Sequence, residues 1–220
     1  MGDWISLTAE DGHGLSAWRA GDGEMSLVVV QEIFGVNEHI RSVTDRFAGL
    51  GFTAIAPALY DRIEPGLETG YEPDDIARGR ELRGKIDNAD ALKDIASAVA
   101  LMAAEGRKVG VVGYCWGGSL AWYSATRLPG VVAAVGYYGG EVPKAKDEAP
   151  QCPVMLHFGA EDHGIPLDGV EAVKAAHPDV PVHIYENAGH GFACDARASF
   201  HEASRDLALD RTLTFFRENL

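Results

Sequence analysis

Basic residues are scarce in this chain. Its 220 residues include 19 lysines and arginines against 33 aspartates and glutamates, which gives a formal net charge of −14 at pH 7. A protein that binds nucleic acid or an anionic membrane needs a basic face to meet the phosphates. The composition therefore argues against both partners. It also implies that an anionic substrate would need a local arginine.

Cysteine is scarce as well. Cys115, Cys152 and Cys194 are an odd number without C-x-x-C spacing, which predicts neither a disulfide framework nor a zinc site. Six histidines show no mutual metal-ligand spacing and are assigned no role: His13, His39, His157, His177, His183 and His201. We therefore expect no metal and no organic cofactor, and a reducing cytoplasm as the location.

Long apolar runs are missing too. Runs such as LVVV at 27–30 are too short to cross a bilayer, and MGDWISLTAEDG at the start lacks the pattern of a signal peptide. The length suits one α/β domain over residues 1–220. We expect a monomer that acts on a small molecule.

Strand-like and helix-like segments alternate along the chain. Residues 4–9 and 15–20 predict an antiparallel opening pair. Further strands are expected at 26–32, 52–57, 107–113, 131–137, 153–159 and 181–186. Helices are expected at 37–48, 75–85, 88–104, 118–127, 167–176 and 200–217, with Asn37 capping the first. This alternation predicts an α/β fold with a mostly parallel sheet and helices on both faces.

The segment VGVVGYCWGG at 109–118 places a cysteine between a strand and a helix. Its G-x-C-x-G pattern matches the strained turn that carries the serine of G-x-S-x-G hydrolases. Cys115 is therefore a candidate nucleophile. The alternative is a small buried hydrophobic residue.

Candidate partners for Cys115 follow two later strands. Asp162 follows the strand at 153–159, and His190 follows the strand at 181–186. The order nucleophile, acid, histidine is that of an α/β-hydrolase, whose site lies at the carboxyl ends of the strands. His190 would act as the base and Asp162 would orient it, while the Trp116 N–H would help to bind the oxyanion. His163 is a weaker candidate for the base because it shares a loop with the acid.

The chain resembles the dienelactone hydrolase family of α/β-hydrolases. The resemblance rests on QEIFGVN at 31–37, VGYCWGG at 112–118, VGYYGG at 135–140, AGHGF at 188–192 and the Glu-Asp pair at 161–162. It implies that Glu32 contacts the resting Cys115 and helps to deprotonate it when substrate arrives. It also implies that the Ile33 N–H is the second oxyanion donor. The alternative for Glu32 is a sheet-edge carboxylate that faces water.

The family's substrate is an unsaturated lactone with a carboxylate, formed from chlorinated catechols and opened to maleylacetate. The resemblance implies two arginines for that carboxylate. The first corresponds to Arg80 or, alternatively, Arg78, and Phe34 is also assigned to substrate binding. The second is absent, because Cys194 stands where the family pattern has arginine, and Arg197 is the nearest replacement.

The sequence therefore predicts a cysteine-dependent lactone hydrolase. A broader carboxylesterase or thioesterase with the same triad is the close alternative. A non-catalytic binding protein and a redox sensor that uses Cys115 are alternatives from other classes.

Overall fold

An eight-stranded sheet forms the centre of the protein. The computed structural model describes all 220 residues, and the strands lie in the order β1-β2-β4-β3-β5-β6-β7-β8. The β1–β2 and β2–β4 pairs are antiparallel and the other five pairs are parallel. The strands are β1 (Asp3–Thr8), β2 (Gly14–Ala20), β3 (Met25–Val30), β4 (Phe52–Pro57), β5 (Val109–Tyr114), β6 (Val131–Tyr137), β7 (Val154–Gly159) and β8 (Val182–Tyr185).

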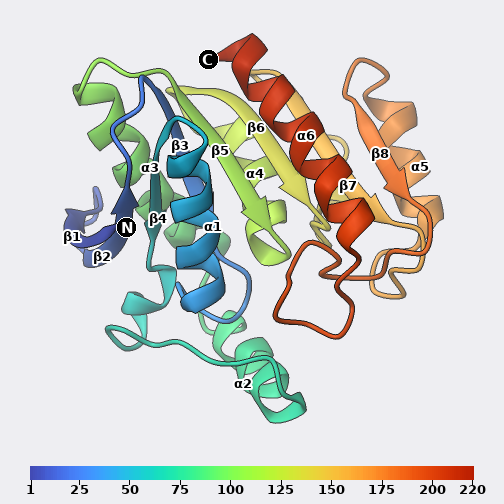
Figure 1. Cartoon of the computed structure of the whole chain (residues 1–220), viewed down its shortest axis with the longest axis horizontal. Coiled ribbons are helices and arrows are strands. Elements are labelled where there is room, and N and C mark those ends of the chain that lie inside the picture. Colours follow the sequence, from blue (N-terminus) through green and yellow to red (C-terminus); the bar gives the residue numbers. More distant parts are fainter.

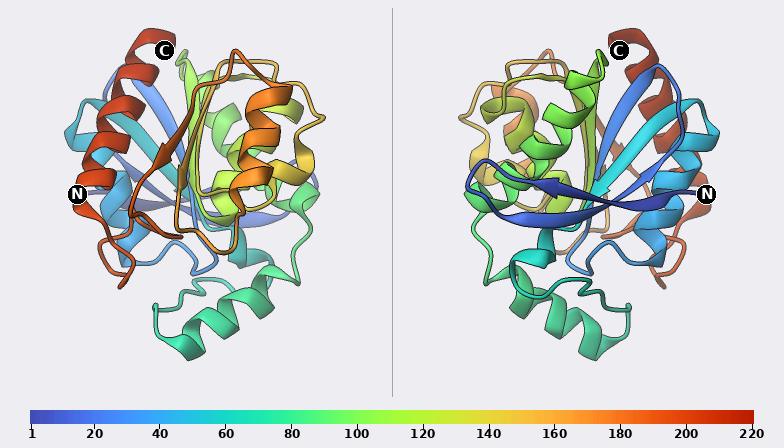
Figure 2. Two further views of the ribbon diagram at one scale, coloured as in Figure 1. Left: turned by 90° about the vertical axis from the view of Figure 1, so that its right-hand side faces the viewer. Right: turned by 90° about the vertical axis from the view of Figure 1, so that its left-hand side faces the viewer.

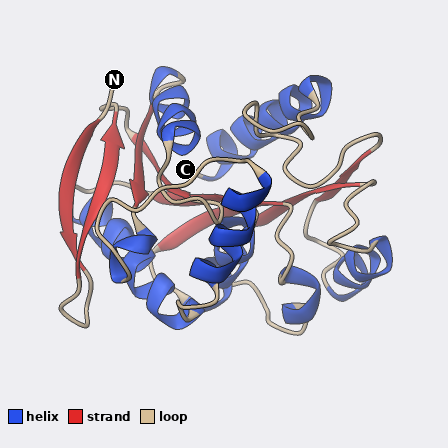
Figure 3. Ribbon diagram, turned by 90° about the horizontal axis from the view of Figure 1, so that it is seen from below, coloured by secondary structure: helices blue, strands red, loops and turns tan.

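Helices cover both faces of this sheet. Helices α1 and α6 lie on one face, and α3, α4 and α5 lie on the other (Figures 1 and 2). Viewed from below, the twisted sheet runs between the helices, with the β1–β2 pair at one end (Figure 3). The helices are α1 (Glu38–Gly49), α2 (Pro73–Arg83), α3 (Asn88–Ala104), α4 (Trp116–Arg127), α5 (Leu167–Ala176) and α6 (Glu202–Asn219), with short 3-10 turns at Leu59–Arg62 and Val142–Ala145.

The expected α/β architecture is confirmed, with small differences at the ends of elements. Asn37 caps α1 as predicted, because its Oδ1 accepts the Ile40 N–H at 3.2 Å. Strand β3 ends at Val30 rather than at residue 32. Helix α4 begins at Trp116, two residues before the expected start. Glu32 therefore lies in a loop beyond its strand.

Parallel pairing brings the loops after β3 and β5 together. Val30 lies opposite Gly113 in the register of these neighbouring strands. Helix α2 projects from the body of the protein on this side (Figure 1). It is tied to the loop after β3, because the Tyr60 hydroxyl donates towards the carbonyls of both Ile33 and Gly79, at 2.9 and 3.2 Å. The carboxyl edge of the sheet is thus the place where side chains from many loops meet.

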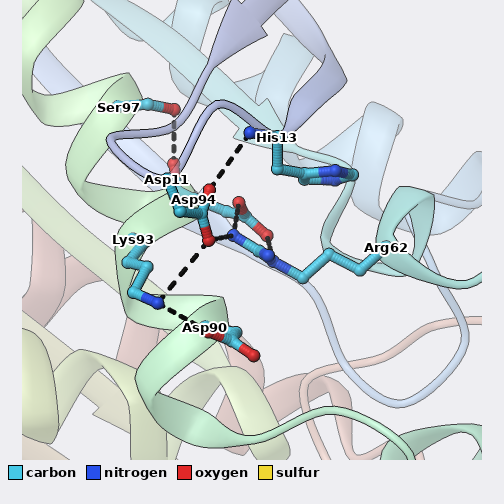
Figure 4. A network of polar contacts seen from close by, with 7 residues as sticks. All are labelled: Asp11, His13, Arg62, Asp90, Lys93, Asp94 and Ser97. Carbon is cyan, nitrogen blue, oxygen red and sulfur yellow. Dashed lines mark hydrogen bonds and ion pairs between the residues drawn. The ribbon is translucent and has the colours of Figure 1, made fainter.

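A buried ionic cluster fixes the region after β4 to helix α3. The Asp94 side chain is fully buried and accepts two hydrogen bonds from the Arg62 guanidinium, at 2.7 and 2.8 Å (Figure 4). Asp11 also pairs with Arg62, at 3.1 Å. Lys93 extends the cluster to Asp90 at the surface. The cluster contains none of the residues of the candidate site described below, and its role is structural.

All three cysteines are free thiols, with Cys115 and Cys152 partly exposed and Cys194 buried. No helix combines the length and the apolar character that a membrane span requires.

Candidate active site

Cys115 occupies a tight turn between β5 and α4. Its backbone φ is 56°, in the left-handed region that side chains other than glycine rarely adopt. A Cβ at Gly113 would overlap the Gly117 carbonyl, and one at Gly117 would overlap the carbonyl of Val30. Both positions therefore require glycine. The turn holds Cys115 at the amino terminus of α4, as the G-x-C-x-G pattern predicts.

The structure brings Cys115, His190 and Asp162 together. His190 Nε2 lies 3.1 Å from Cys115 Sγ, and His190 Nδ1 lies 2.7 Å from Asp162 Oδ2. The other carboxylate oxygen of Asp162 accepts the Gly164 N–H at 2.9 Å, which fixes the buried carboxylate. His163 is exposed and takes no part in this chain of hydrogen bonds.

This geometry favours a charged imidazole. Burial disfavours the charge, but the Cys115 sulfur and the Asp162 carboxylate favour it more strongly, and together they raise the pKa of His190 to about 10. From this position His190 can take up the proton that Cys115 must lose to become a nucleophile. The arrangement is capable of nucleophilic attack followed by proton return.

Two backbone N–H groups in neighbouring loops, one of which carries Cys115, have no hydrogen-bond partner in the protein. Neither Ile33 nor Trp116 donates its N–H to another group of the protein. Ile33 follows β3 and Trp116 follows β5, so the two groups belong to adjacent loops at the same sheet edge. Free donors in this position can hold a developing oxyanion.

Glu32 does not contact Cys115, which differs from the expectation for a resting enzyme. Its side chain is fully buried, so the alternative of a sheet-edge glutamate in water is wrong. One carboxylate oxygen lies 3.2 Å from Arg197 Nη1, and the other accepts from the Tyr71 hydroxyl at 3.3 Å. The reason is that Arg197 neutralises the buried carboxylate and Cys115 Sγ is turned to His190.

Arg197 lies in the loop after β8, and its side chain reaches the site. Burial opposes its charge, but Glu32 and the nearby Cys115 favour it, so the pKa of Arg197 is raised. Its guanidinium carbon lies 5.7 Å from the centre of the Phe34 ring. Phe34 is 1% exposed and packs against Tyr71, so this predicted substrate contact is covered in the present conformation.

The two candidate arginines of α2 lie in different surroundings. Arg78 is exposed and lines a cavity of about 820 Å³ together with Tyr71, Asp75 and Asp195. Arg80 is exposed and does not line that cavity. None of the triad residues lines it either, so the cavity lies beside the triad and not over it. Of the two, Arg78 is the one that faces a cavity.

Several residues at this edge could not be identified from the sequence. Arg83 lies 4.7 Å from the Trp116 ring centre and pairs with Glu141, and Tyr60 stacks on the same ring at 5.9 Å. A tyrosine after β4 and an arginine late in α2 carry no motif. Only the position of Tyr60 directly after a strand end could have suggested a site role.

One group of side chains could hold a metal ion. Glu32, His39 and Cys194 are buried, and their ligand atoms lie within 4.8 Å of one another. His39 had been assigned no role from the sequence, because its partners lie far along the chain.

Known proteins resemble this chain over nearly its whole length. The model of the dienelactone hydrolase family matches residues 15–220. A putative carboxymethylenebutenolidase from Synechocystis sp. is 38% identical over 199 residues, covering 82% of this chain and 80% of the relative. A carboxymethylenebutenolidase from Pseudomonas putida is 34% identical over 227 residues, covering 96% and 94%.

A solved structure gives the same result for the fold. The crystal structure of a putative dienelactone hydrolase from Klebsiella pneumoniae superposes with a TM-score of 0.83 at 33% identity, covering 98% of this chain and 99% of that one. The family match, the relatives and the fold agree. The chain is a hydrolase of ester or lactone bonds and belongs to the dienelactone hydrolase family.

Proposed function

We propose that this protein opens a small unsaturated lactone through an acyl-cysteine intermediate, with Cys115 as nucleophile. The observation that carries the proposal is His190, which lies within hydrogen-bonding distance of both Cys115 Sγ and Asp162. A histidine bridging a nucleophile and a carboxylate is the arrangement that activates nucleophiles in unrelated hydrolases.

The proposed reaction begins when the Cys115 sulfur attacks the lactone carbonyl. The N–H groups of Ile33 and Trp116 stabilise the oxyanion of the tetrahedral intermediate. Collapse breaks the ring C–O bond, and His190 gives a proton to the leaving oxygen. Water, deprotonated by His190, then cleaves the thioester and releases the ring-opened acid. For a dienelactone from chlorocatechol breakdown, that product is maleylacetate.

Arg197 supports a carboxylate-bearing substrate. It is the arginine found beside Glu32, and a substrate carboxylate could take the place of Glu32 on its guanidinium. Glu32 would then be free to turn towards Cys115 and help to remove its proton. Arg78, on the neighbouring cavity, would provide a second positive charge.

A broader esterase or thioesterase is the second candidate function. Cys194 stands in place of an arginine, and Arg197 is already engaged by Glu32. A site whose arginine is already paired with a carboxylate binds an anionic substrate less strongly than a site with two unpaired arginines. Neutral esters would then be hydrolysed as well as acidic lactones.

The test is kcat/KM for a dienelactone and for a neutral aryl acetate, measured on the wild type and on Cys115→Ala. We expect both activities to fall by at least about 1,000-fold in the variant, with the dienelactone strongly preferred by the wild type. Cys152→Ser is the matched control, because Cys152 lies outside the triad, and it should keep full activity. Activity that survives in Cys115→Ala would show that the nucleophile is another residue. Equal rates for both substrates would favour the broader esterase.

A further inference from the structure

Three metal-ligating side chains meet beside the triad. Glu32 comes from the loop after β3, His39 from α1 and Cys194 from the loop after β8. Their ligand atoms all lie within 4.8 Å of one another, and the three residues are 0%, 6% and 0% exposed. The proposed lactone hydrolysis uses neither His39 nor Cys194. The convergence therefore needs its own explanation.

His39 has one ring nitrogen without a partner. Its Nδ1 lies 3.0 Å from Asp195 Oδ1, whereas Nε2 is buried and has no hydrogen bond. The side chain is only 3% exposed, so water does not readily satisfy this nitrogen. In the tautomer of His39 that donates its Nδ1–H to Asp195, Nε2 carries a free lone pair. A carboxylate behind a histidine is also how proteins orient metal-binding imidazoles.

The set of donor atoms indicates the kind of metal. A thiolate, an imidazole and a carboxylate together suit zinc and similar transition metals, whereas magnesium and calcium prefer oxygen alone. In a tetrahedral zinc site, neighbouring ligand atoms lie about 3.3–3.6 Å apart. Side-chain rotations that close the present spacing by about 1 Å would therefore form the site. Three protein ligands leave a fourth position for water or another small ligand.

Glu32 can take part without giving up its arginine. Arg197 holds one of its carboxylate oxygens, and the other oxygen accepts only the 3.3 Å contact from Tyr71. A hydrogen bond of that length is weak and easily replaced. The metal would thus take the oxygen that Tyr71 now contacts, while Arg197 keeps the first.

A cavity at the surface reaches His39, one of the three residues of this cluster. The cavity of about 820 Å³ is lined by His39, Tyr71 and Asp195. Its other walls include the carboxylates of Glu38, Glu68 and Asp75. With Asp195, four carboxylates line the cavity against one arginine, Arg78, and this excess of negative charge raises the local concentration of cations.

We propose that Glu32, His39 and Cys194 bind one divalent transition-metal ion of the zinc type, with Asp195 orienting His39. The Cys194 thiol gives its proton to solvent as the sulfur–metal bond forms, so no oxidant or reductant is needed. The site lies next to the triad and shares no residue with it. It goes beyond the proposed function and does not depend on it.

The test uses protein stripped with a chelator and then titrated with Zn²⁺ against a chromophoric competitor. We expect one Zn²⁺ per chain, and with Co²⁺ a thiolate-to-cobalt charge-transfer band. Cys194→Ser and His39→Gln should each weaken binding at least about 100-fold, and Asp195→Asn about 10-fold or more. Binding of Zn²⁺ should raise the Tm of the wild type, which shows that folded protein binds the ion.

Two controls separate this site from other thiols. Cys152→Ser and Cys115→Ser should bind Zn²⁺ as the wild type does. The proposal is overturned if the wild type binds no stoichiometric Zn²⁺. It is also overturned if binding survives in Cys194→Ser but is lost in Cys115→Ser, which would place the ion on the triad. Circular dichroism of each variant distinguishes a lost ligand from a lost fold, and the wild-type cobalt spectrum tests thiolate ligation without any variant.

Discussion

Two buried carboxylates in this protein are paired with arginines, and the two pairs are built differently. Asp94 meets Arg62 through two hydrogen bonds of 2.7 and 2.8 Å. Glu32 meets Arg197 through one contact of 3.2 Å. Both carboxylate side chains are fully buried, so burial alone does not distinguish them. The difference is in how completely their oxygens are satisfied.

The first pair is saturated and the second can exchange partners. A bidentate arginine–carboxylate pair is directional and strong, and Asp11 adds a further partner to Arg62 (Figure 4). The contacts of Glu32 with Arg197 and Tyr71 are both longer than 3 Å. The structural pair thus holds one geometry. In the Glu32–Arg197 pair, by contrast, a carboxylate oxygen of Glu32 is available to a metal ion, and the Arg197 guanidinium is available to a substrate carboxylate.

The largest effect is expected at the structural pair. Arg62→Ala leaves Asp94 buried without its partner, and loss of a partner in a buried pair costs about 3–5 kcal/mol of unfolding free energy. Burial already raises the pKa of Asp94, against the opposing effect of Arg62. Its pKa in the folded variant therefore lies above the unfolded value, and lowering the pH favours the folded state. The deficit, measured by urea unfolding, should shrink as the pH falls from 7 towards about 4.

The matched control for Arg62→Ala is a partly exposed cation of the same cluster. Lys93→Met breaks partly exposed pairs with Asp90 and Asp11 and should cost no more than about 1 kcal/mol. Equal losses in the two variants would mean that Asp94 does not depend on Arg62. The structural half of the comparison would then be wrong.

Arg197→Met tests the exchangeable pair. We expect a smaller stability loss, of about 1–3 kcal/mol, because Glu32 keeps the Tyr71 hydrogen bond, whereas Asp94 loses both of its side-chain hydrogen bonds. For an acidic lactone, kcat/KM should fall about 10- to 100-fold, because a charged hydrogen bond to the substrate contributes about 1.5–3 kcal/mol. Hydrolysis of a neutral aryl acetate should change little.

Arg78→Met is the comparison variant for Arg197→Met. Arg78 is exposed on the neighbouring cavity, so its loss should affect the acidic substrate less and stability hardly at all. If Arg197→Met slows both substrates alike, Arg197 supports the fold of the site and not the binding of a carboxylate.

These contrasts also show what could be predicted from the sequence. The proximity of Cys115, Asp162 and His190 could be predicted, because each residue follows a strand and parallel strands end at one edge of the sheet. The fold followed from the alternation of strands and helices. The pairing of Glu32 with Arg197 was not predictable, because it joins residues 165 positions apart through side-chain packing.

His39 illustrates the same limit. Its neighbours Cys194 and Asp195 lie in a loop about which neither spacing nor periodicity gives information, and the His39–Asp195 contact spans 156 positions. A search for metal sites by local spacing finds ligands within one segment. It does not find ligands that two separate loops and a helix bring together.

Apart from the control variants, Tyr71→Phe should have the smallest effect on stability, and it bears most directly on how firmly Glu32 is held. The change removes the 3.3 Å contact to Glu32, while Asn37 keeps the Thr69 carbonyl as a partner for its amide. We expect the unfolding free energy to fall by about 1 kcal/mol, because only a long hydrogen bond is lost and Glu32 keeps its ion pair with Arg197.

A second tyrosine provides the control for this last variant. Tyr123 also donates at 3.3 Å to a carboxylate, but Glu141 is 32% exposed, so water can replace the hydroxyl. Tyr123→Phe should therefore cost less than Tyr71→Phe in the same urea titration. A loss above about 3 kcal/mol in Tyr71→Phe would be as large as that expected for Arg62→Ala. Glu32 would then be held as firmly as Asp94, and neither a metal ion nor a substrate carboxylate could exchange readily with its present partners.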